Sequence, residues 1–164
     1  MSHFSVLLSS QAHTLRLPTD MKDDVERFVL QHQTGGATAE RAPFRRQLDF
    51  WAFSIATAIA LGLPALEEAS STWGRKFADT RAVQVPEGLC DLLAVLALTQ
   101  LGVEHPGLDD PGEIVELGNR LAGAGVPIVL ERLKNPDLRT TALDKILDFA
   151  SQLREDALTA SDPE

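Results

Sequence analysis

The sequence predicts a mainly α-helical protein, a single compact domain of about five to six helices with a short β-ribbon or hairpin at its N-terminus. Two long apolar segments are bounded by proline and glycine, as buried helices are, and period-two alternation is confined to short stretches. The 164 residues, 44% hydrophobic and 24% charged, suit one globular domain. We expect residues 1–158 to form this domain, with the ribbon in 1–18, helices in 19–158 and a flexible tail in 159–164.

The N-terminal segment carries the β signal. Residues 4–8 (FSVLL) are apolar and β-prone, and residues 13–17 (HTLRL) alternate between the two faces of a strand. They predict a hairpin, or a single ribbon strand with a loose leader. A helix over residues 20–33 follows, with Thr19 as its N-cap and aspartates in its first turn.

The central helix is expected within residues 44–66, where 17 consecutive residues from Phe50 to Leu66 carry no charge. Pro43 suits a helix start, and Gly62 suits a helix end. A membrane span needs about 20 residues that are predominantly apolar. Because this run is shorter and rich in alanine, serine and threonine, we interpret it as a buried core helix.

The rest of the chain predicts further helices. We expect irregular structure over residues 70–80, a short strand over 81–85 and a second apolar helix over 86–101, which forms the core pair with the central helix. Asp110 is placed to cap a helix that begins at Pro111 and ends at Gly123 or Gly125. A short helix over 127–133 and a last helix over 140–157 complete the chain.

Few residues suggest catalysis. The histidines, His3, His13, His32 and His105, have no metal-ligand spacing that repeats, and Cys90 lies in an apolar helix, where a structural thiol is expected. His105 and nearby acids could form an oxygen-rich site, although a capping turn explains them more simply. We therefore expect no enzyme activity, metal or cofactor, and keep a small-molecule-binding or enzymatic helical domain as the weakest alternative.

The glycines of residues 117–125 (LGNRLAGAG) do not form a phosphate-binding loop, because no strand precedes them and no Walker lysine follows. Close helix packing or a kink is the better explanation of Gly118 and Gly123. Asn119 and Arg120 are expected to anchor a neighbouring segment by hydrogen bonds.

Two basic clusters are candidate binding sites. Arg41, Arg45 and Arg46 lie at the start of the central helix, where a phosphate could bind, although ordinary solvation is an alternative. The loop containing Trp73, Arg75, Lys76 and Phe77 could dock on a partner or stack on bases. Alternatively, its aromatic residues cover one end of the core while its basic residues face water.

The charge distribution argues against non-specific nucleic-acid binding. The net charge is −9, and residues 1–50 are neutral, with six basic and six acidic side chains. Since phosphate neutralisation supplies most non-specific affinity, any DNA contact is expected in the N-terminal third. The absence of a signal-peptide pattern and the single cysteine predict a cytoplasmic protein without a membrane anchor.

Residues 13–31 (HTLRLPTDMKDDVERFVLQ), followed by an apolar helix, resemble the ribbon-helix-helix family. The resemblance implies a dimer in which strand side chains enter the DNA major groove, with Thr14 and Arg16 facing the groove and Leu15 and Leu17 turned inward. Between its two helices this chain has a much longer loop than that family.

A second resemblance is to the small E subunit of bacterial DNA phosphorothioation systems. It covers the end of an apolar helix at residues 61–68, the loop at 76–79 and a second apolar helix at 89–101. It implies a self-associating helical protein linked to DNA in a defence setting, although this chain is longer and more acidic.

The leading hypothesis is a non-enzymatic association or adaptor subunit of a bacterial DNA-linked complex, active in phage defence. It predicts a homo-oligomer and a protein partner. The alternative is a ribbon-helix-helix-like dimer that binds DNA through Thr14, Arg16, Arg41, Arg45 and Arg46.

Overall fold

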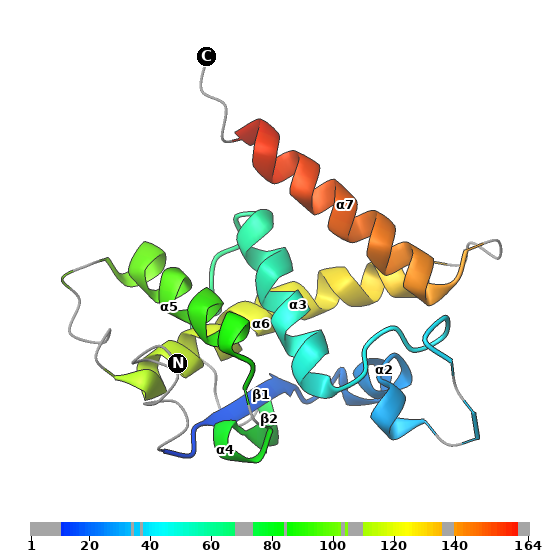
Figure 1. The fold of residues 1–164 in the computed structure, drawn as a ribbon, viewed down its shortest axis with the longest axis horizontal. Coiled ribbons are helices and arrows are strands. Elements are labelled where there is room, and N and C mark those ends of the chain that lie inside the picture. Colours follow the sequence, from blue (N-terminus) through cyan, green and yellow to red (C-terminus); the bar gives the residue numbers. More distant parts are fainter. Residues whose placement is uncertain are drawn as a thin grey trace.

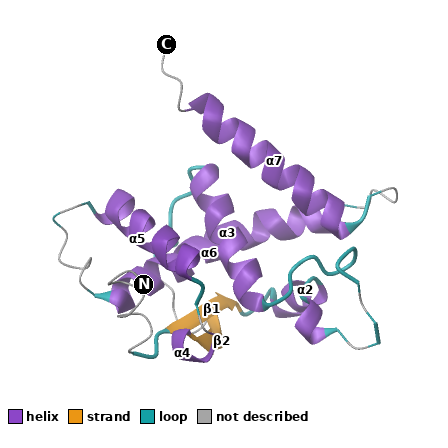
Figure 2. Cartoon of the chain, viewed as in Figure 1, coloured by secondary structure: helices purple, strands orange, loops and turns teal. Residues whose placement is uncertain are grey.

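The computed structural model describes residues 11–33, 35–36, 38–67, 74–83, 85–102, 104, 110–135 and 140–160. It confirms the predicted fold class, because helices dominate and the strands form one small antiparallel sheet (Figures 1 and 2). The elements in chain order are β1 (Thr14–Pro18), α2 (Lys22–Arg27), the 3-10 helix η1 (Leu30–His32), α3 (Gln47–Ala60), β2 (Gly74–Asp79), α4 (Thr80–Val83), α5 (Glu87–Leu101), α6 (Pro111–Lys134) and α7 (Ala142–Ala160).

Helices α3 and α6 cross at the centre of the molecule and form its core pair (Figure 1). Their backbones come close because α6 presents glycine at the crossing. A Cβ on Gly125 would lie 2.0 Å from the carbonyl oxygen of Ser54, and one on Gly118 would lie 3.0 Å from the Trp51 ring. Packing by Gly118 was expected. The predicted core pair of the central helix with the 86–101 helix is wrong, since α5 packs mainly on α6.

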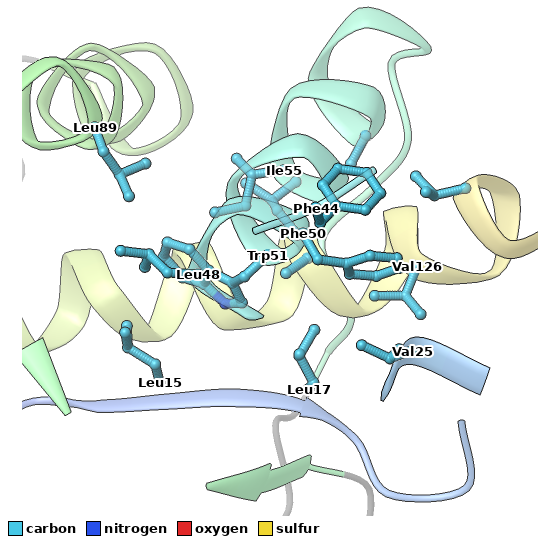
Figure 3. Packing of buried hydrophobic residues seen from close by; sticks show 14 of the residues in the cluster. Leu15, Leu17, Val25, Phe44, Leu48, Phe50, Trp51, Ile55, Leu89 and Val126 are labelled. Atoms are coloured by element: carbon cyan, nitrogen blue, oxygen red, sulfur yellow. The ribbon is translucent and has the colours of Figure 1, made fainter. Parts of the chain in front are cut away.

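The core is built around the buried face of α3 (Figure 3). Trp51, Phe50 and Ile55 are fully buried there, and Leu15 and Leu17 project into the same cluster from β1. The alternation of β1 therefore has the predicted sense, with its leucines inward. The ring of Phe50 meets that of Phe44 edge to face at 4.9 Å.

The partner of β1 comes from a distant part of the chain. β1 pairs antiparallel with β2, and the register shifts between Leu15 and Arg16. The expectation of irregular structure over residues 70–80 is wrong for β2, and the strand predicted over 81–85 is wrong because α4 occupies 80–83. The N–H of Ala82 bonds the Asp79 side chain at 2.9 Å, which stabilises a turn at the end of β2. The leader at residues 4–8 lies outside the described residues.

Helix α2 is shorter than predicted. The chain leaves the helix after Arg27 because Phe44 competes for the backbone that follows: Phe44 N–H donates to the Phe28 carbonyl, and Leu30 N–H donates to the Phe44 carbonyl at 2.8 Å. The predicted N-cap is also corrected, since Met21 rather than Thr19 stands at that position.

Helix α6 is one continuous helix, so the predicted end at Gly123 or Gly125 and the separate 127–133 helix are wrong. Its buried positions recur across Pro127, including Val126 and Val129. Pro127 itself is exposed, and burial of the continuous apolar face outweighs the lost backbone hydrogen bond. The predicted cap is confirmed, as Asp110 accepts the Gly112 N–H at 2.7 Å.

Helix α7 begins at a capping box and diverges from the body towards the C-terminus (Figure 1). Thr141 N–H donates to the Asp144 carboxylate at 2.9 Å, and Asp144 N–H donates to the Thr141 hydroxyl. The Thr141 hydroxyl, which donates to the Asp144 carboxylate at 2.7 Å, and the Thr141 N–H together hold the pKa of Asp144 below its ordinary value. None of the helices in the described part of the chain is long and apolar enough to cross a bilayer.

Candidate interaction surfaces

The buried side chain of Asn119 connects β1, α3 and α6. Its Oδ1 accepts the backbone N–H of Arg16 at 2.9 Å and the indole N–H of Trp51 at 3.2 Å. Its Nδ2 donates to the Thr14 carbonyl at 2.9 Å and to Glu116 at 3.1 Å. The amide thus bonds the edge of β1 that faces away from β2, as a neighbouring strand would. The expectation that Asn119 anchors a neighbouring segment is confirmed.

Arg120 confirms the second half of that expectation. Its Nε donates to the Leu66 carbonyl, and its own carbonyl accepts the Leu66 N–H at 3.4 Å. The segment that follows α3 is thereby fixed along α6. Asn119 and Arg120 therefore organise the fold.

The outer face of the sheet carries Thr14 and Arg16, the two residues that the ribbon-helix-helix resemblance places in the DNA major groove. The guanidinium of Arg16 donates to the Gly74 carbonyl at 2.9 Å, and its stem lies against Gly74, where a Cβ would be 3.3 Å from two Arg16 carbons. Lys76 is the cross-strand partner of Arg16, and Thr14 is opposite Asp79. The side chain of Arg16 is therefore folded along the ribbon.

The three arginines at the start of the central helix differ in their surroundings. Arg46 donates its backbone N–H to the Asp49 carboxylate at 3.0 Å and forms a 2.9 Å ion pair with it. Arg45 is exposed. Arg41 is also exposed and lines a hollow of about 750 Å³ with Arg27 and Glu40. No hydrogen bond or ion pair within the described residues joins these arginines to Thr14 or Arg16.

The predicted docking loop is divided between the two faces of the sheet. Arg75 forms a 2.9 Å ion pair with Glu26 of α2, and both side chains are mostly buried. Lys76 is exposed and pairs with Asp79 at 3.5 Å, while Phe77 packs against the core. Trp73 lies outside the described residues. Phe77 at the core and Lys76 facing water agree with the alternative expectation for this loop, whereas Arg75 departs from it.

The histidines and Cys90, the remaining candidates for chemistry, form no recognisable site among the described residues. The ring of His13 packs against the first turn of α6, where a Cβ added to Gly112 would lie 3.4 Å from its Nδ1. The Nε2 of His13 is buried and has no hydrogen-bond partner. His32 contacts Gln31 at the surface, and Cys90 is buried. His3 and His105 lie outside the described residues. Within the described residues, no three histidines, cysteines or acids are placed to hold a metal ion.

An uncovered apolar face on α5 is the feature that sequence reasoning missed. Val95 is 58% exposed and Leu98 44% exposed, whereas Leu93, Leu96 and Ala97 on the opposite side are buried. An all-apolar sequence predicts a helix buried on every side. No charge occurs between Asp91 and Leu101, but this pattern did not indicate that Val95 and Leu98 would stay exposed, with none of the described elements packed over them.

Other large apolar side chains are exposed at scattered positions. Ile59 and Leu61 lie at the end of α3, and Leu147 and Leu158 lie on α7 among acidic and basic residues. Isolated exposed apolar residues are ordinary on protein surfaces. Within the described residues, α5 differs from these cases because Val95 and Leu98, one turn apart, are both more than 40% exposed on the same side of the helix.

Comparisons with known proteins return no match: no family model, curated protein or solved structure matches this chain.

Proposed function

We propose that this protein acts by association, as a non-enzymatic subunit or adaptor whose docking element is the outer face of α5. The observation that carries the proposal is the exposure of Val95 and Leu98 on a helix whose only charged residue between Gly88 and Gly102 is Asp91. Exposed apolar patches of this kind mark interaction sites.

Burial of these side chains would supply a useful driving force. Complete burial of a valine or leucine side chain stabilises by about 1.5–3 kcal/mol. Val95 and Leu98 are roughly half exposed, so a partner that covers them gains about 1 kcal/mol from each. Half-buried Leu92 adds to the same surface. Such increments are small individually, so shape complementarity across the whole helix determines the affinity.

The proposed setting is a bacterial DNA-linked complex, in phage defence. It rests on the resemblance of residues 61–68, 76–79 and 89–101 to the small E subunit of phosphorothioation systems. The second of these segments falls in β2 and the third in α5. In this proposal the chain contributes a protein contact, and DNA is held by other subunits, because a net charge of −9 disfavours phosphate binding.

Direct DNA binding is the second proposal, favoured by the outward position of Thr14 and Arg16 on the ribbon. A ribbon-helix-helix dimer would pair β1 with its copy. That pairing competes here with β2 on one edge of β1 and with Asn119 on the other. A protein in which Arg16, Arg45 and Arg46 are all replaced by alanine should lose salt-dependent DNA affinity. Unchanged binding of a short duplex would refute this second proposal.

The association proposal is tested by purifying the tagged protein from the organism that encodes it. Val95→Asp places a charge on the α5 face, and Leu147→Asp is the matched control on α7 (56% exposed). The proposal expects a partner, either a different protein or an untagged copy of this chain, to be recovered in a constant ratio with wild type and with Leu147→Asp but lost with Val95→Asp. Equal recovery with all three proteins, or no partner in any, would overturn it.

A further inference from the structure

We propose that the outer face of α5 binds the same face of a second copy of this chain, antiparallel, about a two-fold axis near Val95. This inference rests on the proposed docking role of α5 and names its occupant.

The charge on the protein restricts which surface a second copy can use. Each copy carries a net charge of −9, so most of the surface repels another copy. Helix α5 carries two acidic residues, Glu87 at its first position and Asp91, and no other charged side chain occurs up to Gly102. Along α5 two copies can therefore approach with little like-charge contact, and the contact buries Val95 and Leu98.

The order of residues along α5 is self-complementary in the antiparallel direction. At 3.6 residues per turn, Asp91, Val95, Leu98 and Gly102 lie on one face of the helix, with Thr99 at its margin. In a two-fold contact each residue meets the partner position that meets it in return. An axis at Val95 pairs Val95 with itself.

The same axis decides what Asp91 faces. Asp91 falls opposite Thr99 of the second copy, an uncharged side chain whose hydroxyl donates to the Leu96 carbonyl of its own helix at 2.9 Å. Leu98 meets Leu92, and the two ends of the helix, Gly88 and Gly102, approach without side chains. A parallel arrangement would instead place Asp91 against Asp91, which destabilises the contact. The antiparallel direction is thus favoured.

The size of the contact predicts its strength. Fifteen residues of helix are about 22 Å long, and one helix pair of this length falls in the small class of interfaces, below about 1,200 Å². Association of this kind is reversible and depends on protein concentration. The oligomeric state must therefore be measured over a concentration range.

The test is sedimentation equilibrium of the full chain at low salt over that range, with charge variants at positions 91 and 99. Wild type is expected to shift from the 17.8 kDa monomer to a dimer as concentration rises. Thr99→Glu places a carboxylate opposite Asp91 at both symmetry-related contacts. The like-charge repulsion should weaken the dimer by about fivefold. Asp91→Lys combined with Thr99→Glu should restore or strengthen it, because both new contacts become attractive.

The control is Leu147→Glu on α7, which should associate as wild type does, and circular dichroism verifies that each variant is folded. A wild type that stays monomeric, or a Thr99→Glu defect that Asp91→Lys does not rescue, would overturn the antiparallel dimer. These outcomes leave the association proposal standing if a different protein is still recovered with wild type and lost with Val95→Asp. If wild type stays monomeric and no partner is lost with Val95→Asp, both proposals are overturned.

Discussion

The approach of Gly125 to the backbone of Ser54 sets the distance between α3 and α6, so replacing Gly125 with alanine tests the central packing directly. The added Cβ would lie 2.0 Å from the Ser54 carbonyl oxygen and 2.8 Å from its carbonyl carbon. Carbon atoms pack best at about 3.5–4.0 Å. Backbone atoms cannot rotate away, so one helix must move by about 1 Å.

The expected magnitude follows from two opposing terms. Alanine is favoured over glycine in a helix by about 1 kcal/mol. Overpacking of a core costs about 1–3 kcal/mol and sometimes more, and a clash with rigid backbone belongs at the upper end or beyond. We expect Gly125→Ala to reduce the free energy of unfolding by at least about 2 kcal/mol. For a chain of this size that lowers Tm by about 4–8 °C.

Two other glycines provide a graded comparison. A Cβ on Gly118 would lie 3.0 Å from carbons of the Trp51 ring and 3.1 Å from Leu93, side chains that can yield slightly, so Gly118→Ala should have a smaller effect. A Cβ on Gly88 would meet nothing within 4 Å, and Gly88→Ala should be neutral or stabilise by up to about 1 kcal/mol.

Urea denaturation followed by circular dichroism measures this series, at a protein concentration low enough to keep each variant monomeric. The order of stability should be Gly88→Ala, then Gly118→Ala, then Gly125→Ala. If Gly125→Ala is as stable as Gly88→Ala, α3 and α6 do not cross at this point, and the reasoning about their packing is refuted.

Three further predictions concern single residues. Asn119→Ala leaves the buried indole N–H and two backbone groups of β1 unpaired, so denaturation should show a loss of about 3 kcal/mol; Glu116→Ala, which removes one half-exposed partner, should cost less than about 1 kcal/mol. Pro127→Ala should stabilise by about 1–3 kcal/mol, because Pro127 is exposed inside α6 and denies it a hydrogen bond; a lower Tm would contradict this. The Asp144 carboxylate stabilises the start of α7 above its ordinary pKa of 3.8, and this contribution is lost as pH falls through the lower pKa of the folded state. Asp144→Asn should therefore lower Tm at pH 7 but by progressively less as the pH falls below 3.8, and a difference that does not shrink with falling pH would contradict the capping role.

Local signals in the sequence determined much of the architecture. The uncharged run that begins at Phe50 predicted the central helix, and Asp110 with Pro111 predicted the start of α6, because burial and capping leave short-range patterns. The alternation of residues 13–17 also placed Leu15 and Leu17 on one face of β1, and that face is buried in the structure. Asn119 and Arg120 were correctly expected to anchor a neighbouring segment.

The partners of these elements depended on contacts between distant residues. β2 lacks a strong strand pattern and exists because β1, about 60 positions earlier, supplies its hydrogen bonds. Helix α6 continues through Pro127 because its apolar face is buried along its whole length, which no window around the proline reveals. The local sequence thus determined where helices α3, α5 and α7 form and where α6 begins. Only the tertiary structure decided that glycines bring α6 against α3 and that α5 keeps one apolar face uncovered, because packing depends on the shapes of surfaces far apart in the chain.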